Sequence, residues 1–133
     1  LIGELPDGTD ITEIRPNMFY YSLEKSFVIR LAMGLADDLR NKNVAVVALS
    51  PGFMRSEEVL DVLGVREENW REGIARDPHF QYSETPFYVG RAVAALAADP
   101  DVMRRSGKAL LSGRLAREYG FTDMDGTQPV WLY

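Results

Sequence analysis

Tyr21 and Lys25 are the first residues of this sequence whose types and spacing suit catalysis. They are four positions apart, so on a helix their side chains lie on one face. A phenol has a pKa of about 10, and a nearby cation favours its ionised form. Such a pair can pass a proton to a carbonyl oxygen while hydride reaches the carbon. Tyr20 lies about 100° around the helix and has no lysine at this spacing.

A second group of residues lies where an apolar run ends. Residues 44–49 are continuously apolar, which is typical of a strand covered on both faces in a parallel sheet. Pro51 and Gly52 follow and let the backbone come close to a ligand. In open α/β sheets, ligands bind at the carboxyl ends of the strands. A lone tyrosine–lysine pair is more often a plain exposed pair, so the functional hypothesis depends on both groups together.

A long helix is expected to carry the tyrosine and the lysine. The pattern extends from about Met18 to Asn41, with Asn17 able to cap its start and residues 41–43 ending it. Its apolar stripe repeats every four residues, at Leu23, Phe27, Leu31, Leu35 and Leu39.

The other elements predict an α/β fold. Residues 1–5 and 108–111 are expected strands, and residues 53–83 suggest a helical excursion over the top of the sheet. Residues 84–98 predict a second helix, with Thr85 as its cap. Strand, helix, strand, helix, strand is the order of a parallel sheet with helices on both faces.

These motifs, in this order, resemble the catalytic half of a short-chain dehydrogenase/reductase (SDR). The resemblance is carried by Tyr-x-x-x-Lys at residues 21–25 and by Ser-Pro-Gly-Phe-Met-Arg-Ser at residues 50–56. Gly90-Arg-Ala-Val-Ala-Ala-Leu resembles the last major helix of the family, and Ser106-Gly-Lys-Ala-Leu-Leu its final strand. It implies one partial domain over residues 1–133: the C-terminal half of a doubly wound Rossmann-like parallel sheet, with about three strands.

The resemblance also implies a role for each matching residue. Tyr21 matches the general acid/base, and Lys25 matches the lysine that tunes the tyrosine and holds the nicotinamide ribose. Residues 53–83 correspond to the substrate-loop region. The implied reaction is interconversion of a small-molecule carbonyl and alcohol with NAD or NADP. The implied cofactor-binding residues are Tyr21, Lys25, Pro51, Gly52, Met54 and Ser56.

The sequence departs from the family at the catalytic serine. The family places it about thirteen residues before the tyrosine, whereas no serine precedes Ser22 and Gly8 stands at that spacing. Thr9 or Thr12 could supply the hydroxyl, and Thr9 is the candidate. The alternative is a divergent, non-catalytic dinucleotide-binding or scaffold protein that keeps the fold. An enoyl reductase is disfavoured because Met18 stands where that group has its tyrosine, and sugar-nucleotide epimerases lack the Pro-Gly strand ending.

The sequence has no glycine-rich phosphate-binding fingerprint, and it begins with leucine rather than methionine. The family has this fingerprint in its N-terminal half. We therefore expect the chain to be the C-terminal half of a longer protein.

Composition excludes several other functions. A net charge of −5 and the lack of basic runs argue against nucleic acid and membrane surfaces. The absence of cysteine removes disulfides and thiolate sites and agrees with a cytoplasmic location, while a single histidine rules out a multi-histidine metal site. Further apolar residues outside the helix stripe predict a homodimer or homotetramer, namely Phe19, Tyr20, Ile29 and Met33.

Overall fold

The computed structural model describes residues 19–131. The strand predicted at residues 1–5 and the candidate Thr9 therefore lie outside the described residues. The elements in chain order are α1 (Phe19–Leu39), η1 (Arg40–Lys42), β1 (Ala48–Ser50), α2 (Glu57–Leu63), η2 (Glu67–Ala75), η3 (Pro78–Tyr82), α3 (Pro86–Ala98), η4 (Val102–Arg105), β2 (Ala109–Leu111) and α4 (Ser112–Tyr119), where η denotes a 3₁₀ helix.

Strands β1 and β2 pair in parallel, with Ala48 opposite Ala109. The pairing continues before the regular strands, because the Gly107 N–H donates to the carbonyl of Val46 over 2.8 Å. Within residues 19–131 the sheet has these two strands. The predicted α/β class with a parallel sheet is confirmed, whereas the first of the three expected strands lies outside the described range.

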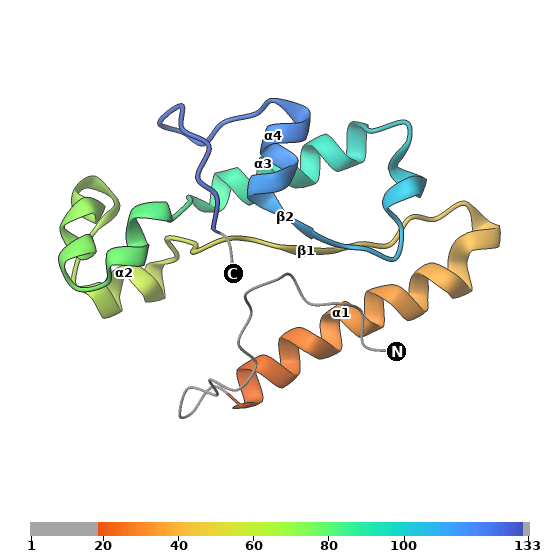
Figure 1. The fold of residues 1–133 in the computed structure, drawn as a ribbon, viewed down its shortest axis with the longest axis horizontal. Coiled ribbons are helices and arrows are strands. Elements are labelled where there is room, and N and C mark those ends of the chain that lie inside the picture. Colours follow the sequence, from red (N-terminus) through yellow and green to blue (C-terminus); the bar gives the residue numbers. More distant parts are fainter. Residues whose placement is uncertain (1–18, 132–133) are drawn as a thin grey trace.

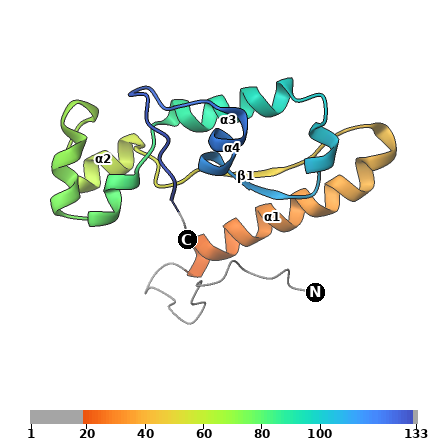
Figure 2. The same ribbon diagram turned by 45° about the horizontal axis from the view of Figure 1, so that its top comes forward.

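Helices cover both faces of the sheet. Figures 1 and 2 place α1 on one face and α3 with α4 on the other. The core between the sheet and helices α3 and α4 is built on three buried residues, Ala92, Leu96 and Leu115. Half-buried side chains from the strands and the following segments complete it: Val47, Leu49, Val102, Leu110, Tyr119 and Phe121.

Helix α1 contacts the rest of the molecule through small residues. Ala32 and Ala36 are its buried residues, and a Cβ built on Gly107 would lie 3.5 Å from the Cβ of Ala36. The chain leaves the helix at Asn43, whose left-handed φ of 55° helps to reverse its direction. Strand β1 therefore runs back along α1, and the first turns of α1 lie at the end of the molecule where β1 finishes (Figure 1).

Residues 53–83 form a small helical lobe beyond the end of β1, as predicted (Figure 2). Its core consists of Leu63, Val65 and Phe80, and Phe80 is fully buried. Helix α2 begins at its cap Ser56 and ends at Gly64, where a φ of 62° suits glycine. Within residues 19–131, no helix combines the length and apolarity that crossing a bilayer requires.

Candidate active site

Tyr21 and Lys25 lie together on the exposed face of α1. The Nζ atom of Lys25 is 4.9 Å from the centroid of the Tyr21 ring. Tyr21 is half exposed, at 52%. Tyr20 is 78% exposed and packs edge-on against Phe19 instead. The structure therefore places the lysine beside one tyrosine of this helix, as the spacing predicts.

The second group of predicted residues occupies residues 51–56, which we call the strand-end segment. It leaves β1 at the end of the molecule where α1 begins, as both ribbon views show (Figures 1 and 2). Within the described part of the chain, no hydrogen bond or ion pair joins this segment to Tyr21 or Lys25. The structure thus brings together the members of each group and places both groups at one end of the sheet.

Gly52 is enclosed on two sides. Its N–H donates to Oε2 of Glu84 over 3.0 Å. A Cβ at this position would lie 2.9 Å from the same oxygen and 3.0 Å from the Cβ of Trp131, both closer than ordinary contact. Glycine is therefore favoured here because a side chain would require its neighbours or the backbone to shift.

The rest of the strand-end segment is held by backbone pairing. The N–H of Glu84 donates to the carbonyl of Phe53 over 2.9 Å, and the N–H of Arg55 donates to the carbonyl of Glu84 over 2.8 Å. These bonds form an isolated parallel bridge between Met54 and Glu84. Ser56 is half-buried, and its hydroxyl oxygen accepts the N–H of Val59 over 3.3 Å. The hydroxyl proton of this serine can still be donated to another group.

A buried arginine connects the segment to the helical lobe. Arg55 donates to the carboxylate of Glu67 over 3.0 Å and to the carbonyl of Ser83 over 2.8 Å. Its guanidinium also stacks on Trp70, with 4.4 Å between the guanidinium carbon and the ring centroid. A second carboxylate, that of Asp123, lies 3.9 Å away. Partners on several sides compensate for removing this charge from water.

Asp123 determines how helix α3 begins. Thr85 occupies the cap position, as predicted, but its side chain makes no capping bond. Its hydroxyl donates instead to the Asp123 carboxylate, which also accepts the N–H of Thr85 over 2.8 Å. A buried carboxylate far along the chain competes with the local cap, and sequence spacing cannot reveal that competition.

Glu84 is the most deeply buried carboxyl group near the strand-end segment, with the residue 1% exposed. Its Oε2 accepts both the Gly52 N–H and the hydroxyl of Ser112, the latter over 2.7 Å. Burial raises the pKa of Glu84 above its ordinary value of 4.5, and the nearby Asp123 acts in the same direction. The hydrogen bonds from Ser112 and Gly52 and the charge of Arg55 oppose that rise.

Aromatic side chains border the strand-end segment on the side of the lobe. Trp131 lies edge-on to Phe53 and His79, with ring centroids 5.7 and 5.1 Å apart, and is 6.4 Å from the ring of Tyr82. Phe80 is fully buried in the core of the lobe. Phe53 and Trp70 pack against it, Tyr82 is half exposed, and Phe87 is exposed on α3.

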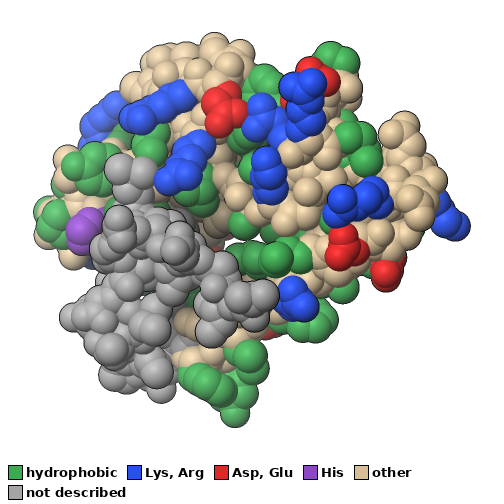
Figure 3. Space-filling view, turned by 45° about the vertical axis from the view of Figure 1, so that its right-hand side comes forward, with side chains coloured by type: hydrophobic (Ala, Val, Ile, Leu, Met, Phe, Trp, Pro, Cys, Tyr) green, Lys and Arg blue, Asp and Glu red, His purple; other side chains and the backbone are tan. Residues whose placement is uncertain are grey.

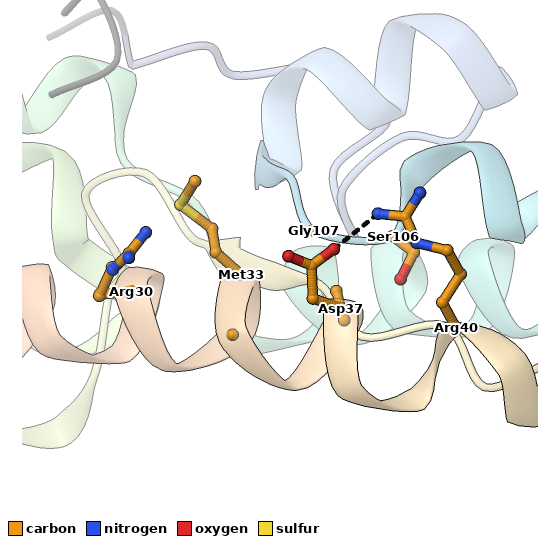
Figure 4. A pocket seen from close by; sticks show the side chains of 8 residues that line it. Arg30, Met33, Asp37, Arg40, Ser106 and Gly107 are labelled. Carbon is orange, nitrogen blue, oxygen red and sulfur yellow. Dashed lines mark hydrogen bonds and ion pairs between the residues drawn. The ribbon is translucent and has the colours of Figure 1, made fainter. Parts of the chain in front are cut away.

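A hollow of about 290 Å³ lies elsewhere, between the second half of α1 and the turn before β2. Arg30, Met33, Asp37 and Arg40 line it from the helix, with Ser106 opposite, and Asp37 pairs with Arg40 (Figure 4). This is the amino end of β2, whereas ligands of open α/β sheets bind at the carboxyl ends. The hollow is therefore not part of the candidate site.

Sequence reasoning missed Glu84, Ser112 and Asp123. Ser112 follows directly after strand β2, so the rule that singled out Pro51 could also have identified it. Glu84 had no such signal, because its link to Gly52 spans 32 residues.

Comparison with known proteins gives no match to any protein-family model, but it does find similar proteins. The chain is 37% identical over 115 residues to dehydrogenase/reductase SDR family member 1 of Mus musculus, covering 85% of this chain and 36% of that protein. The Homo sapiens protein of the same name is 36% identical over 120 residues, with the same coverage.

A third relative carries a more specific name. It is the NADH-dependent L-xylulose reductase of Ambrosiozyma monospora, 30% identical over 111 residues, which cover 84% of this chain and 40% of that protein. The chain therefore spans well under half the length of the curated relatives that it matches.

Proposed function

Because the chain belongs to the short-chain dehydrogenase/reductase family, we propose that it is part of an oxidoreductase that interconverts a carbonyl and an alcohol. The observation that carries the proposal is the Tyr21–Lys25 pair. The ammonium lies 4.9 Å from the ring centroid of a half-exposed tyrosine. The pair belongs to the first turns of α1, and this helix begins at the end of the molecule where β1 finishes (Figure 1), the end at which ligands of open α/β folds bind.

In this proposal Tyr21 is the general acid of the reduction. Its hydroxyl donates a proton to the carbonyl oxygen as that oxygen gains negative charge, and the resulting phenolate is stabilised by the adjacent ammonium of Lys25. A bound nicotinamide supplies the hydride that reaches the carbonyl carbon. In the oxidation, the same tyrosine takes the proton back from the alcohol.

The described residues fit the nicotinamide end of NAD or NADP. Lys25 is exposed and offers N–H donors to ribose hydroxyls, and the strand-end segment presents backbone beside a glycine that has no room for a side chain. Ser56 adds a hydroxyl with a proton to donate. The name of one relative includes NADH, which supports a nicotinamide cofactor. No glycine-rich phosphate loop is present in this sequence.

We also propose that the lobe at residues 53–83 borders the substrate. It follows directly from the strand-end segment and turns Tyr82 and His79 towards Trp131. Half-exposed aromatic rings with polar edges suit a small organic substrate that has both apolar and polar groups.

The exposed face of α1 supports the proposal of a homo-oligomer. Hydrophobic side chains gather along the lower edge of the molecule, where α1 lies (Figure 3). So many large exposed apolar side chains on one helix are unusual on a surface that remains in water. Its exposed members on this helix include Phe19, Leu23, Phe27, Val28 and Leu31.

A panel of small aldehydes and ketones tests the proposed function in the intact protein. With NADH and NADPH supplied separately, reduction of at least one carbonyl is expected, measured by loss of nicotinamide absorbance. Cofactor binding is measured in parallel by calorimetry. Absence of both turnover and binding would refute the proposal.

One observation favours a second candidate. Gly8 stands where the family has its catalytic serine, so the hydroxyl group of that serine is missing at this position. A non-catalytic dinucleotide-binding or scaffold protein that keeps the fold is therefore the second candidate. Tight cofactor binding without turnover of any carbonyl would support this function and exclude the reductase.

A further inference from the structure

We propose that Glu84 is a positioning residue whose carboxyl group sets the place of the Gly52 amide, and so the affinity of the strand-end segment for the cofactor. This inference rests on the proposed function. It starts from a contact between segments far apart in the chain, the 3.0 Å bond from the Gly52 N–H to Oε2 of Glu84.

The carboxyl group links the carboxyl ends of both parallel strands. Oε2 accepts the Gly52 N–H beyond β1 and the Ser112 hydroxyl at the end of β2, over 3.0 and 2.7 Å. The backbone of Glu84 adds two bonds to the same segment, one to Phe53 and one from Arg55. Two backbone bonds and one side-chain bond therefore fix this short loop.

The contact leaves almost no freedom to the loop. A Cβ on Gly52 would lie 2.9 Å from Oε2 and 3.0 Å from the Cβ of Trp131, so the glycine is enclosed between the carboxyl group and the tryptophan. A carboxyl group that moves away from Gly52 removes the bond to its N–H and opens space beside it, so we expect the loop to shift. In the proposed enzyme this backbone lies beside the nicotinamide.

The neutral form of Glu84 is sufficient for this role. A single oxygen accepts both bonds, and Oε1 is buried without a hydrogen-bond partner among the described residues. An ionised carboxylate with an unpartnered buried oxygen is costly. Burial also raises the pKa of Glu84. The amide oxygen of a glutamine can accept the same two hydrogen bonds, so we expect glutamine at this position to hold Gly52 as the glutamate does.

Two substitutions separate the effect of the position of the Glu84 side chain from the effect of its charge. Glu84→Gln keeps the length of the side chain and loses the carboxyl group. Glu84→Asp keeps the carboxyl group but shortens the reach by one methylene, so the bond to Gly52 cannot form at its present length. If position matters, the glutamine variant resembles wild type and the aspartate variant does not.

The experiment uses the intact protein with NADH or NADPH and a carbonyl that wild type reduces. Glu84→Asp is expected to raise the KM for the cofactor about tenfold or more, with a smaller change in kcat, whereas Glu84→Gln stays within about twofold of wild type. Tyr119→Phe is the control, because it removes a hydrogen bond to the carboxylate of Asp99 at the far end of α3. Its KM should equal that of wild type.

Amide hydrogen exchange gives a readout that needs no activity. Exchange at Gly52 should accelerate in Glu84→Asp and not in Glu84→Gln, while exchange at Leu110 in β2 stays unchanged. Equal KM and equal exchange in all variants would overturn the proposal, as would a glutamine variant as impaired as the aspartate variant. If wild type neither binds cofactor nor reduces a carbonyl, the proposed function fails, and the exchange data alone decide whether Glu84 positions the loop.

Discussion

Replacing Gly52 with alanine adds one methyl group where the structure has no space. The new Cβ would lie 2.9 Å from Oε2 of Glu84 and 3.0 Å from the Cβ of Trp131, whereas ordinary contacts begin at 3.4 Å. Both neighbours are restrained, the first by its bond to Ser112 and the second by edge-on packing against Phe53. The backbone must therefore shift by several tenths of an ångström, and overpacking of this kind costs about 1–3 kcal/mol.

Gly90 provides the matched control for this substitution. It lies inside α3, and a Cβ there would meet nothing within 4 Å. Alanine at such a helix position stabilises by about 0.5–1 kcal/mol relative to glycine. Urea unfolding of the intact protein should therefore give opposite signs, with Gly52→Ala less stable than wild type and Gly90→Ala more stable. A Gly52→Ala protein as stable as wild type would refute the geometry of the strand-end segment.

Three further predictions concern charge and the surface. Arg55→Met should destabilise by about 3–5 kcal/mol in urea unfolding because it removes the cation next to the buried carboxylate of Asp123. Arg71→Met, at an exposed arginine that also stacks on Trp70, should cost under about 1 kcal/mol, and equal losses would contradict this. Burial raises the pKa of Glu84 in the folded protein above its unfolded value of 4.5. The contribution of Glu84 to the free energy of unfolding is therefore fully present below pH 4.5 and is lost as the pH rises through the folded-state pKa. The unfolding free energy of Glu84→Gln relative to wild type should therefore increase with pH across that window, and a pH-independent difference would be the opposite result. Phe27→Glu, at a side chain 64% exposed on α1, should shift light scattering towards the monomer, whereas Val93→Glu, at one 55% exposed on α3, should not; an unchanged Phe27→Glu oligomer would contradict the assigned interface.

The elements with a strong local period could be predicted from the sequence. A stripe of apolar residues every four positions predicted α1 closely, and it is observed at Phe19–Leu39. The stripe does not mark the packed face, however, because Leu23, Phe27, Leu31 and Leu35 are exposed and the buried residues are Ala32 and Ala36. The apolar run at residues 44–49 predicted β1, but the regular strand is Ala48–Ser50. Its length depends on where β2 pairs with it, which is a contact between distant segments.

Long-range polar contacts account for the parts of the site that could not be predicted. Thr85 was expected to cap its own helix, and its hydroxyl instead donates to Asp123, 38 positions later. Glu84 looked like an ordinary first residue of a helix, whereas it is a buried carboxyl group bonded to Gly52. Competition between a local partner and a distant one depends on the packed fold, so residue spacing alone does not determine it.

In the proposed reductase Tyr21 transfers the proton to the carbonyl oxygen, and Tyr21→Phe in the intact protein tests this role most directly. The matched control is Tyr20→Phe, the neighbouring and more exposed phenol, which has no lysine beside it. Steady-state kcat should fall by about 10²–10⁴-fold in Tyr21→Phe, with cofactor binding retained, and remain at the wild-type value in Tyr20→Phe. Wild-type turnover by Tyr21→Phe would contradict the catalytic assignment.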